Sequence, residues 1–147
     1  MKSFLDTSSL FPVFLADHPH HTASLRLYKR CTPDAAFCAS HSLAEIYSTL
    51  TRIPPPHRVA PDQAVEFLES MRSRFSFISL DGDVYLAAIR DAAANRIIGG
   101  TIYDALIARC AIQAGADTIF TWNTRHFQLL GTEIVRRLRT PDSTEVI

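Results

Sequence analysis

The chain has 147 residues, of which 47% are hydrophobic and 20% charged, and its 15 acidic residues balance 15 basic ones. This length fits one domain, residues 1–147, and the composition excludes a wholly disordered chain. Neutral charge argues against coating nucleic acid by bulk charge, and no segment approaches the roughly 20 apolar residues that span a bilayer, so we expect a soluble, cytoplasmic globular domain.

Strands and helices are expected to alternate along the chain. A short apolar strand is predicted at residues 3–5, followed by a helix that Thr7 or Ser8 caps and that runs through Leu15. Three prolines at 54–56 form a stiff loop between helices. Apolar periodicity and cap signals predict further helices at 22–30, 42–52, 63–74, 82–95 and 101–114, and strands at 35–39, 75–80, 118–122 and, at an edge, 133–135.

This order of elements predicts an α/β fold. Helices should cover both faces of a central, mainly parallel sheet of four to five strands. A chain of this length can bury such a core without covalent cross-links. Cys31, Cys38 and Cys110 are odd in number, lack CxxC spacing and lie in apolar surroundings, so we expect free buried thiols.

Four polar residues fall at the carboxyl edge of the expected sheet. Asp6 and Asn123 each end a strand, while Glu45 and Asp104 each lie near the start of a helix packed there. In open parallel sheets, active groups gather beyond the carboxyl ends of the strands. Acids at such an edge can share Mg²⁺ or Mn²⁺, because these cations prefer oxygen ligands and keep waters, one of which can be the nucleophile.

Each of these residues also has a purely structural interpretation. Glu45 and Asp104 fall at the third position of possible capping boxes that begin at Ser42 and Thr101. Asp6 can cap the helix that follows it, and the asparagine after the last central strand suits a turn or a helix start. Taken one residue at a time, the sequence leaves both interpretations open.

Four short motifs contain these residues. They read DTSSL at 6–10, LAE at 43–45, YDALIA at 103–108 and TWNTRHF at 121–127. In order and approximate spacing they resemble the successive motifs of PIN-domain ribonucleases, particularly VapC-type toxins, and the resemblance runs from residue 4 to about residue 127. It implies a PIN-like three-layer α/β/α fold and an endoribonuclease that depends on Mg²⁺ or Mn²⁺.

The resemblance also implies roles for individual residues. Asp6, Glu45 and Asp104 match the three acidic metal ligands and, with Asn123, make up the expected catalytic set. Asn123 stands where the family often has Asp, and His126 replaces another frequent Asp. A cation held by Asp6 and Asp104 would orient a water for attack on an RNA phosphodiester, and Glu45 would hold or deprotonate that water.

Further residues beside the motifs are expected to contact RNA or to support the site. The hydroxyl of Ser8 or Thr7 matches one that supports the family's site. Arg109 and Arg125 equally suit the solvent-facing ends of amphipathic helices. Tyr103 and Trp122 are candidates for stacking on bases, but their positions favour packing at the rim of the core. The expected substrate-binding residues are Ser8, Arg109, Arg125 and His126.

The resemblance further implies the toxin of a type II toxin–antitoxin pair, with a cognate antitoxin as partner and a homodimer. Because the sequence has no long apolar segment, we expect no membrane association. Two alternatives stay open. Asn123 and His126 suit a degenerate PIN-like module that binds RNA or protein without catalysis. A phosphatase of the aspartyl-phosphate type would use Asp6 as nucleophile, but it expects a second Asp two residues later, where Ser8 stands.

Overall fold

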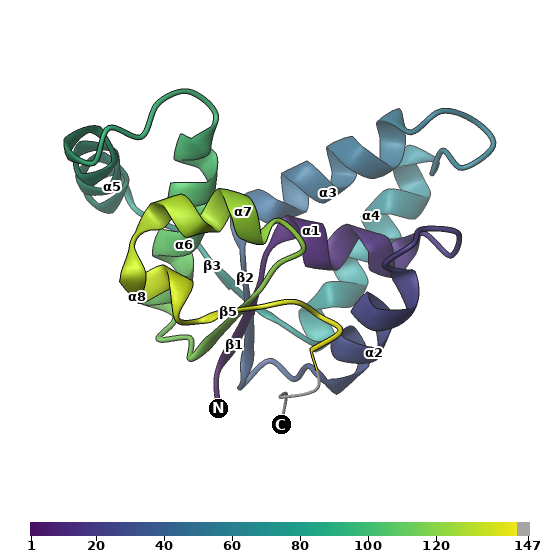
Figure 1. Ribbon diagram of the computed structural model, residues 1–147. Coiled ribbons are helices and arrows are strands. Elements are labelled where there is room, and N and C mark those ends of the chain that lie inside the picture. Colours follow the sequence, from purple (N-terminus) through teal and green to yellow (C-terminus); the bar gives the residue numbers. More distant parts are fainter. Residues whose placement is uncertain (144–147) are drawn as a thin grey trace.

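A five-stranded, fully parallel sheet forms the middle layer of the protein (Figure 1). Its spatial order is β3-β2-β1-β4-β5, and every neighbouring pair of strands is parallel. The expected central parallel sheet is therefore confirmed, with five strands. In chain order these are β1 (Ser3–Leu5), β2 (Ala36–Ala39), β3 (Ser76–Ile78), β4 (Thr118–Phe120) and β5 (Leu138–Arg139).

The computed structural model describes residues 1–143. Residues 144–147 belong to the expected single domain but lie outside the described residues. No helix within residues 1–143 has the length and apolar character needed to cross a membrane. The helical segments are α1 (Thr7–Leu10), η1 (Phe11–Phe14), α2 (His21–Arg30), α3 (Ser40–Arg52), α4 (Pro61–Ser70), η2 (Met71–Ser73), α5 (Gly82–Ala94), α6 (Thr101–Gln113), α7 (Thr124–Phe127), η3 (Gln128–Leu130) and α8 (Thr132–Val135).

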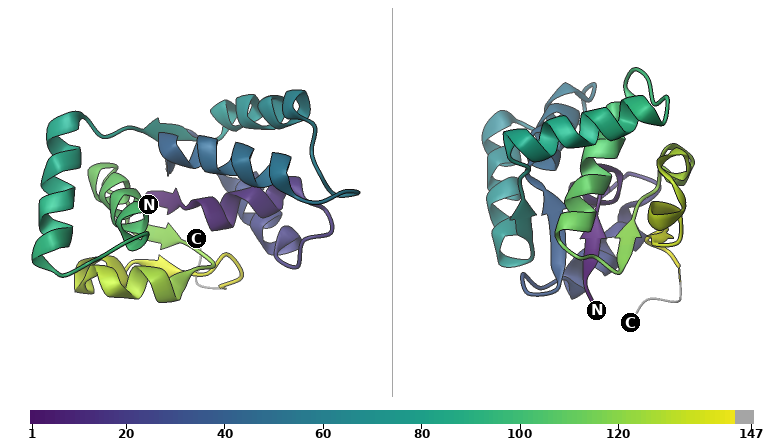
Figure 2. Two further views of the ribbon diagram at one scale, coloured as in Figure 1. Left: turned by 90° about the horizontal axis from the view of Figure 1, so that it is seen from above. Right: turned by 90° about the vertical axis from the view of Figure 1, so that its left-hand side faces the viewer.

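Alternate residues of the central strands supply two separate cores. Leu5 of β1 and Phe120 of β4 pack with α1 to α4, whereas Phe4 and Ile119 pack with α6 to α8. All four side chains are fully buried, because successive side chains of a strand point to opposite faces of the sheet. Helices thus lie on both sides of the strands, with α5 outside α6 (Figure 2). The three cysteines are free and buried, as expected.

The first helix differs from its prediction at both ends. The α-helix stops at Leu10 and continues as the 3-10 helix η1, with Pro12 in its first turn. Proline lacks the backbone N–H that an α-helix would need there, which explains the change of helix type. The N-cap is Asp6, whose carboxylate accepts the N–H of Ser9 at 3.1 Å, and not either of the hydroxyl residues that follow it.

The predicted edge strand at 133–135 is wrong. Gly131 has a φ of 96°, and the chain after it forms the short helix α8, whose Ile134 is buried in the second core. A φ in this range is accessible to glycine without a steric penalty, so the turn depends on this residue. The edge strand is β5, three residues further along, where Leu138 pairs with Ile119 of β4.

Candidate active site

Asp6 is the most buried acid at the carboxyl edge of the sheet. Its backbone N–H donates to the carbonyl oxygen of Phe120 at 3.1 Å, which keeps the ends of β1 and β4 together. Only 3% of the residue is exposed. Its Oδ1 accepts from Ser8 Oγ at 2.8 Å and from the N–H of Ser9 at 3.1 Å, and Oδ2 accepts from Thr121 Oγ1 at 2.8 Å. Hydrogen bonds from two segments therefore fix both carboxylate oxygens.

Burial also changes the charge equilibrium of Asp6. It raises the pKa of the carboxyl from 3.8 to about 6, although hydrogen bonds from Ser8, Thr121 and Ser9 favour the charged form. Within residues 1–143 all of the hydrogen-bond donors to this carboxylate are neutral. The ionised group at neutral pH thus lacks a cationic hydrogen-bond partner in that part of the chain, and a bound cation would stabilise it.

Glu45 is tied to the same corner through the residue next to Asp6. Thr7 Oγ1 lies 3.0 Å from Glu45 Oε1 and 2.9 Å from the hydroxyl of Ser42, one turn earlier on α3. Ser42 is fully buried, so these contacts connect the start of α1 to the first turns of α3. On the other side, His41 Nε2 lies 3.6 Å from Glu45 Oε1. The carboxylate therefore stands between a hydroxyl and an imidazole.

Asp104 enters the site from the first turn of α6. Partial burial raises the pKa of its carboxyl, the nearby His126 lowers it, and the negative charge of Glu45 raises it again. His126 Nδ1 lies 3.6 Å from Asp104 Oδ2. The influence of Glu45 on Asp104 places these two acids, from different helices, within electrostatic reach of each other.

The capping interpretation of Glu45 and Asp104 is wrong. Helix α6 begins at Thr101 with Gly100 as N-cap, and α3 begins two residues before Ser42 with an alanine as N-cap. Neither N-cap has a side-chain hydrogen bond. No reciprocal capping box forms at either helix, although Asp104 lies in the first turn of α6, where a negative charge is favoured by the helix dipole.

The residues after β4 lie on an exposed turn beside Asp6. The backbone N–H of Asn123 donates to Thr121 Oγ1 at 2.9 Å. Asn123 is the N-cap residue of α7, but its exposed side chain makes no capping hydrogen bond. Arg125 and His126 are exposed on α7. The Ser8 hydroxyl, which donates to Asp6, also accepts the N–H of Trp122 at 2.9 Å. Ser8 is thus engaged in positioning Asp6.

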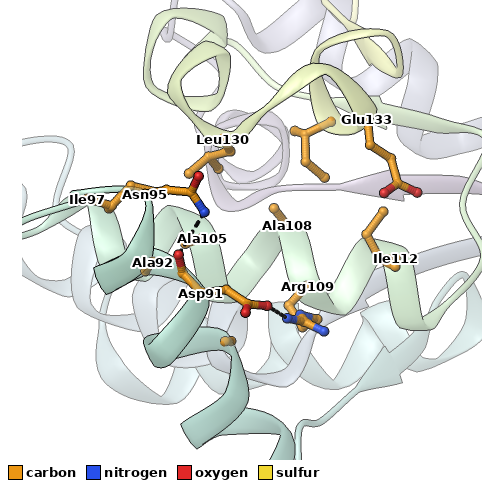
Figure 3. A pocket seen from close by; sticks show the side chains of 12 residues that line it. Asp91, Ala92, Asn95, Ile97, Ala105, Ala108, Arg109, Ile112, Leu130 and Glu133 are labelled. Atoms are coloured by element: carbon orange, nitrogen blue, oxygen red, sulfur yellow. Dashed lines mark hydrogen bonds and ion pairs between the residues drawn. The ribbon is translucent and has the colours of Figure 1, made fainter.

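Arg109 is engaged elsewhere. Its Nη2 lies 2.6 Å from Asp91 Oδ2 of α5, and the pair lines a hollow of about 390 Å³ between α5, α6 and the η3–α8 segment (Figure 3). Within residues 1–143 no hydrogen bond or ion pair joins Arg109 to Asp6, Glu45 or Asp104. The structure therefore does not bring Arg109 together with the acids, and a phosphate contact by this residue stays a prediction.

Two residues of this site were not predicted from the sequence. Thr121 links Asp6 to the turn at Asn123, and the available signal was its place as the first residue of the motif at 121–127. His41 faces Glu45 from one helical turn earlier, and this i,i+4 spacing was the available signal.

The donor set of the site suits a hard divalent cation. Within residues 1–143 no three acids, histidines or cysteines lie close enough together to hold one ion as the side chains stand. However, three different segments present carboxylates at one edge, and Mg²⁺ and Mn²⁺ prefer such oxygen ligands. A cation would also relieve the unpaired charge of Asp6 and the repulsion between Glu45 and Asp104. By these criteria the residues of the site fit a Mg²⁺ or Mn²⁺ ion.

Comparison with known proteins agrees with this architecture. A family model for the PIN domain matches residues 3–131. The chain is 35% identical over 134 residues to Ribonuclease VapC40 of Mycobacterium tuberculosis, covering 91% of this chain and 92% of that protein. It is 34% identical over 113 residues to Ribonuclease VapC27 of the same organism, covering 77% and 79%.

Solved structures share the fold at lower sequence identity. The structure of Mycobacterium tuberculosis VapC20, described as a Sarcin-Ricin loop cleaving toxin, has a TM-score of 0.62 at 20% identity and covers 80% of this chain and 87% of that one. The VapBC2 structure from Rickettsia felis, bound to a promoter DNA fragment, has a TM-score of 0.63 at 22% identity and covers 95% and 98%.

The five-stranded parallel sheet with helices on both faces is thus that of a PIN domain. With 35% identity over nine-tenths of both chains, the protein belongs to the PIN-domain family of VapC ribonucleases. The resemblance inferred from the four motifs is confirmed.

Proposed function

We propose that the chain is a Mg²⁺- or Mn²⁺-dependent endoribonuclease that hydrolyses RNA phosphodiester bonds, and that it acts as the toxin of a type II toxin–antitoxin pair. The observation that carries the proposal is Asp6, a buried carboxylate that accepts from neutral donors only within residues 1–143. Glu45 contacts the adjacent Thr7, and Asp104 lies within electrostatic reach of Glu45. The names of the ribonuclease relatives support RNA as the substrate.

The proposed roles follow from these contacts. Asp6 and Asp104 would hold the cation, which supplies positive charge to a phosphate oxygen and lowers the pKa of a bound water. Glu45, oriented by Thr7, would accept the proton of the attacking water. The new bond joins the water oxygen to phosphorus, and the bond from phosphorus to the leaving sugar oxygen breaks while that oxygen takes a proton from solvent.

The exposed turn after β4 would contact the substrate. Asn123 presents a neutral amide next to the acids, and His126 and Arg125 present hydrogen-bond donors on α7. Donors of this kind suit phosphate oxygens of the RNA backbone. Ser8 would position Asp6 and not contact the RNA directly, since its hydroxyl donates to Asp6 and accepts the backbone N–H of Trp122.

A cognate antitoxin and a homodimeric assembly complete the proposal. Two related structures carry the name VapBC, one from Rickettsia felis and one from nontypeable Haemophilus influenzae. An antitoxin would inhibit most simply by placing a basic side chain among the acids, where it competes with the cation. A short neighbouring reading frame whose product co-purifies with this chain would support the partner.

Incubation of the purified chain with structured RNA separates this proposal from a non-catalytic PIN-like module. Cleavage in Mn²⁺ that disappears with a chelator and with Asp6→Asn supports the enzyme. RNA that stays intact with every divalent metal, while it still binds the protein, supports the module and overturns the nuclease.

A further inference from the structure

Tyr103 is an exposed aromatic residue next to Asp104 of the candidate site. It directly precedes Asp104 in the first turn of α6, and 57% of the residue is exposed, although the same helix buries Leu106 and Ile107 further along. Within residues 1–143 its hydroxyl has no hydrogen-bond partner. The expectation that Tyr103 packs at the rim of the core is therefore wrong.

Trp122 behaves in the opposite way. Its Nε1–H donates to the buried Ser24 Oγ at 3.0 Å, and its ring stacks on His20 with centroids 3.7 Å apart and planes within 9°. One face of the indole is thus covered by His20, and its nitrogen is hydrogen-bonded to Ser24. Of the two aromatic residues beside the motifs, Tyr103 is the one that leaves its ring available to a ligand.

The ring of His41 lies parallel to that of Tyr103. The planes of His41 and Tyr103 are within 9° of each other, with ring centroids 6.3 Å apart. This separation is at the wide end for aromatic pairs and much larger than the 3.7 Å of the His20–Trp122 stack. The two rings are aligned but leave stacking surface that they do not use on each other.

The positions of these rings relate them directly to the acids. His41 comes from the start of α3 and lies 3.6 Å from Glu45, while Tyr103 is the neighbour of Asp104 in α6. The side chain of His41 is half exposed. A planar group of a ligand that stacks on these rings would therefore bring the rest of that ligand close to Glu45 and Asp104.

We propose that Tyr103 and His41 form a stacking platform for the nucleobase next to the scissile phosphate. This inference rests on the proposed ribonuclease function and adds a substrate contact to it. Aromatic side chains bind single-stranded nucleic acid by stacking, which tolerates any base because every base has a π-face. Only an unpaired base exposes that face, so the platform selects a single-stranded or loop nucleotide at the cleavage site.

The test combines variants of Tyr103 with changes in the RNA. The substrate is a single-stranded RNA that the parent chain cuts in Mn²⁺, together with a set of strands that each carry one abasic ribose. Tyr103→Ala should lower kcat/KM by roughly 5- to 150-fold, the range for loss of one base–aromatic stack. Tyr103→Phe keeps the ring and should match the parent. Tyr47→Ala removes an exposed tyrosine from α3 and should also match the parent.

The abasic strands separate stacking from a merely structural role. In the parent, one abasic position beside the cut should lower kcat/KM by a factor similar to that of Tyr103→Ala. In Tyr103→Ala the same abasic position should cause a smaller loss than in the parent, because only His41 is left to stack on the base. Urea unfolding of each variant checks that the fold is intact.

The outcomes distinguish the two proposals. If the parent cuts RNA and Tyr103→Ala cuts it equally well, the platform is wrong and the ribonuclease stands. If Tyr103→Ala is impaired but every abasic strand still lowers its activity as in the parent, Tyr103 does not contact the base and the platform is again overturned. If the parent cuts no RNA in Mn²⁺, the proposed function fails and the platform fails with it.

Discussion

The buried carboxylate of Asp6 predicts how the stability of the metal-free protein changes with pH. Its pKa rises from 3.8 to about 6 on folding, because burial disfavours the charged form. The contribution of this group to stability is therefore fully present below pH 3.8 and is lost as the pH rises through 6. At 1.36 kcal/mol per unit the ionised group costs the fold about 3 kcal/mol, and about 2 kcal/mol of this loss falls between pH 4 and pH 7.5.

Asp6→Asn removes the ionisation while keeping the shape of the side chain. The amide oxygen can still accept from Ser8 and from the N–H of Ser9, and the amide NH₂ faces Thr121 Oγ1, a hydroxyl that can rotate to accept. The free energy of unfolding of the variant, relative to the parent, should therefore rise by about 2 kcal/mol between pH 4 and pH 7.5.

Urea unfolding in the presence of a chelator measures this difference, and Trp122, the only tryptophan in the chain, supplies the fluorescence signal. Asp81→Asn is the matched control. Asp81 caps α5 by accepting the N–H of Val84 at 2.9 Å, as Asp6 caps α1, but it is exposed. It reports the effect of exchanging a capping carboxylate for an amide. A difference between Asp6→Asn and the parent that stays constant with pH, or moves in favour of the parent, would refute the burial argument.

Three further substitutions test neighbouring parts of the site. Asp104→Asn should leave the metal-free protein at pH 7.5 at least as stable as the parent in urea unfolding, because burial and Glu45 raise the pKa of the carboxyl more than His126 lowers it; a loss of stability contradicts this. Asn123→Asp adds a carboxylate and should tighten Mn²⁺ binding in calorimetric titration; unchanged affinity means that the side chain does not face the metal. Thr121→Val leaves Asp6 Oδ2 without its donor and should lower the free energy of unfolding by about 1–3 kcal/mol; an unchanged urea midpoint contradicts the role given to this hydroxyl.

The central strands could be predicted from the sequence because their apolar runs are short and clearly bounded. Phe4 and Leu5, and Ile119 and Phe120, form adjacent apolar pairs that a sheet buried on both faces requires. The edge strand could not be predicted in the same way. Residues 133–135 have an equally suitable composition, but Gly131 and the packing of Ile134 against the second core make them helical.

The acids of the site could be predicted from the order of the motifs, but the environment of each acid could not. The partners of Asp6 include Thr121, which is 115 residues away in sequence. Which neighbouring element each side chain of α6 faces is also determined by the tertiary structure. Arg109 follows Asp104 by five residues, about 140° further around the helix, and therefore faces Asp91 of α5. The exposure of Tyr103 depends on which elements pack against the first turn of α6, and sequence periodicity does not report this.

The rate of RNA cleavage as a function of Mn²⁺ concentration tests the central claim most directly, measured for the parent, Asp6→Asn and Asp117→Asn. Asp117 precedes β4 at the opposite edge of the sheet, where it accepts the backbone N–H of Lys2 at 2.8 Å. The account predicts that the parent and Asp117→Asn cleave RNA with the same saturable dependence on Mn²⁺, and that Asp6→Asn is slower by at least about 100-fold. Cleavage that persists in a chelator, or that Asp6→Asn leaves unchanged, would contradict the account.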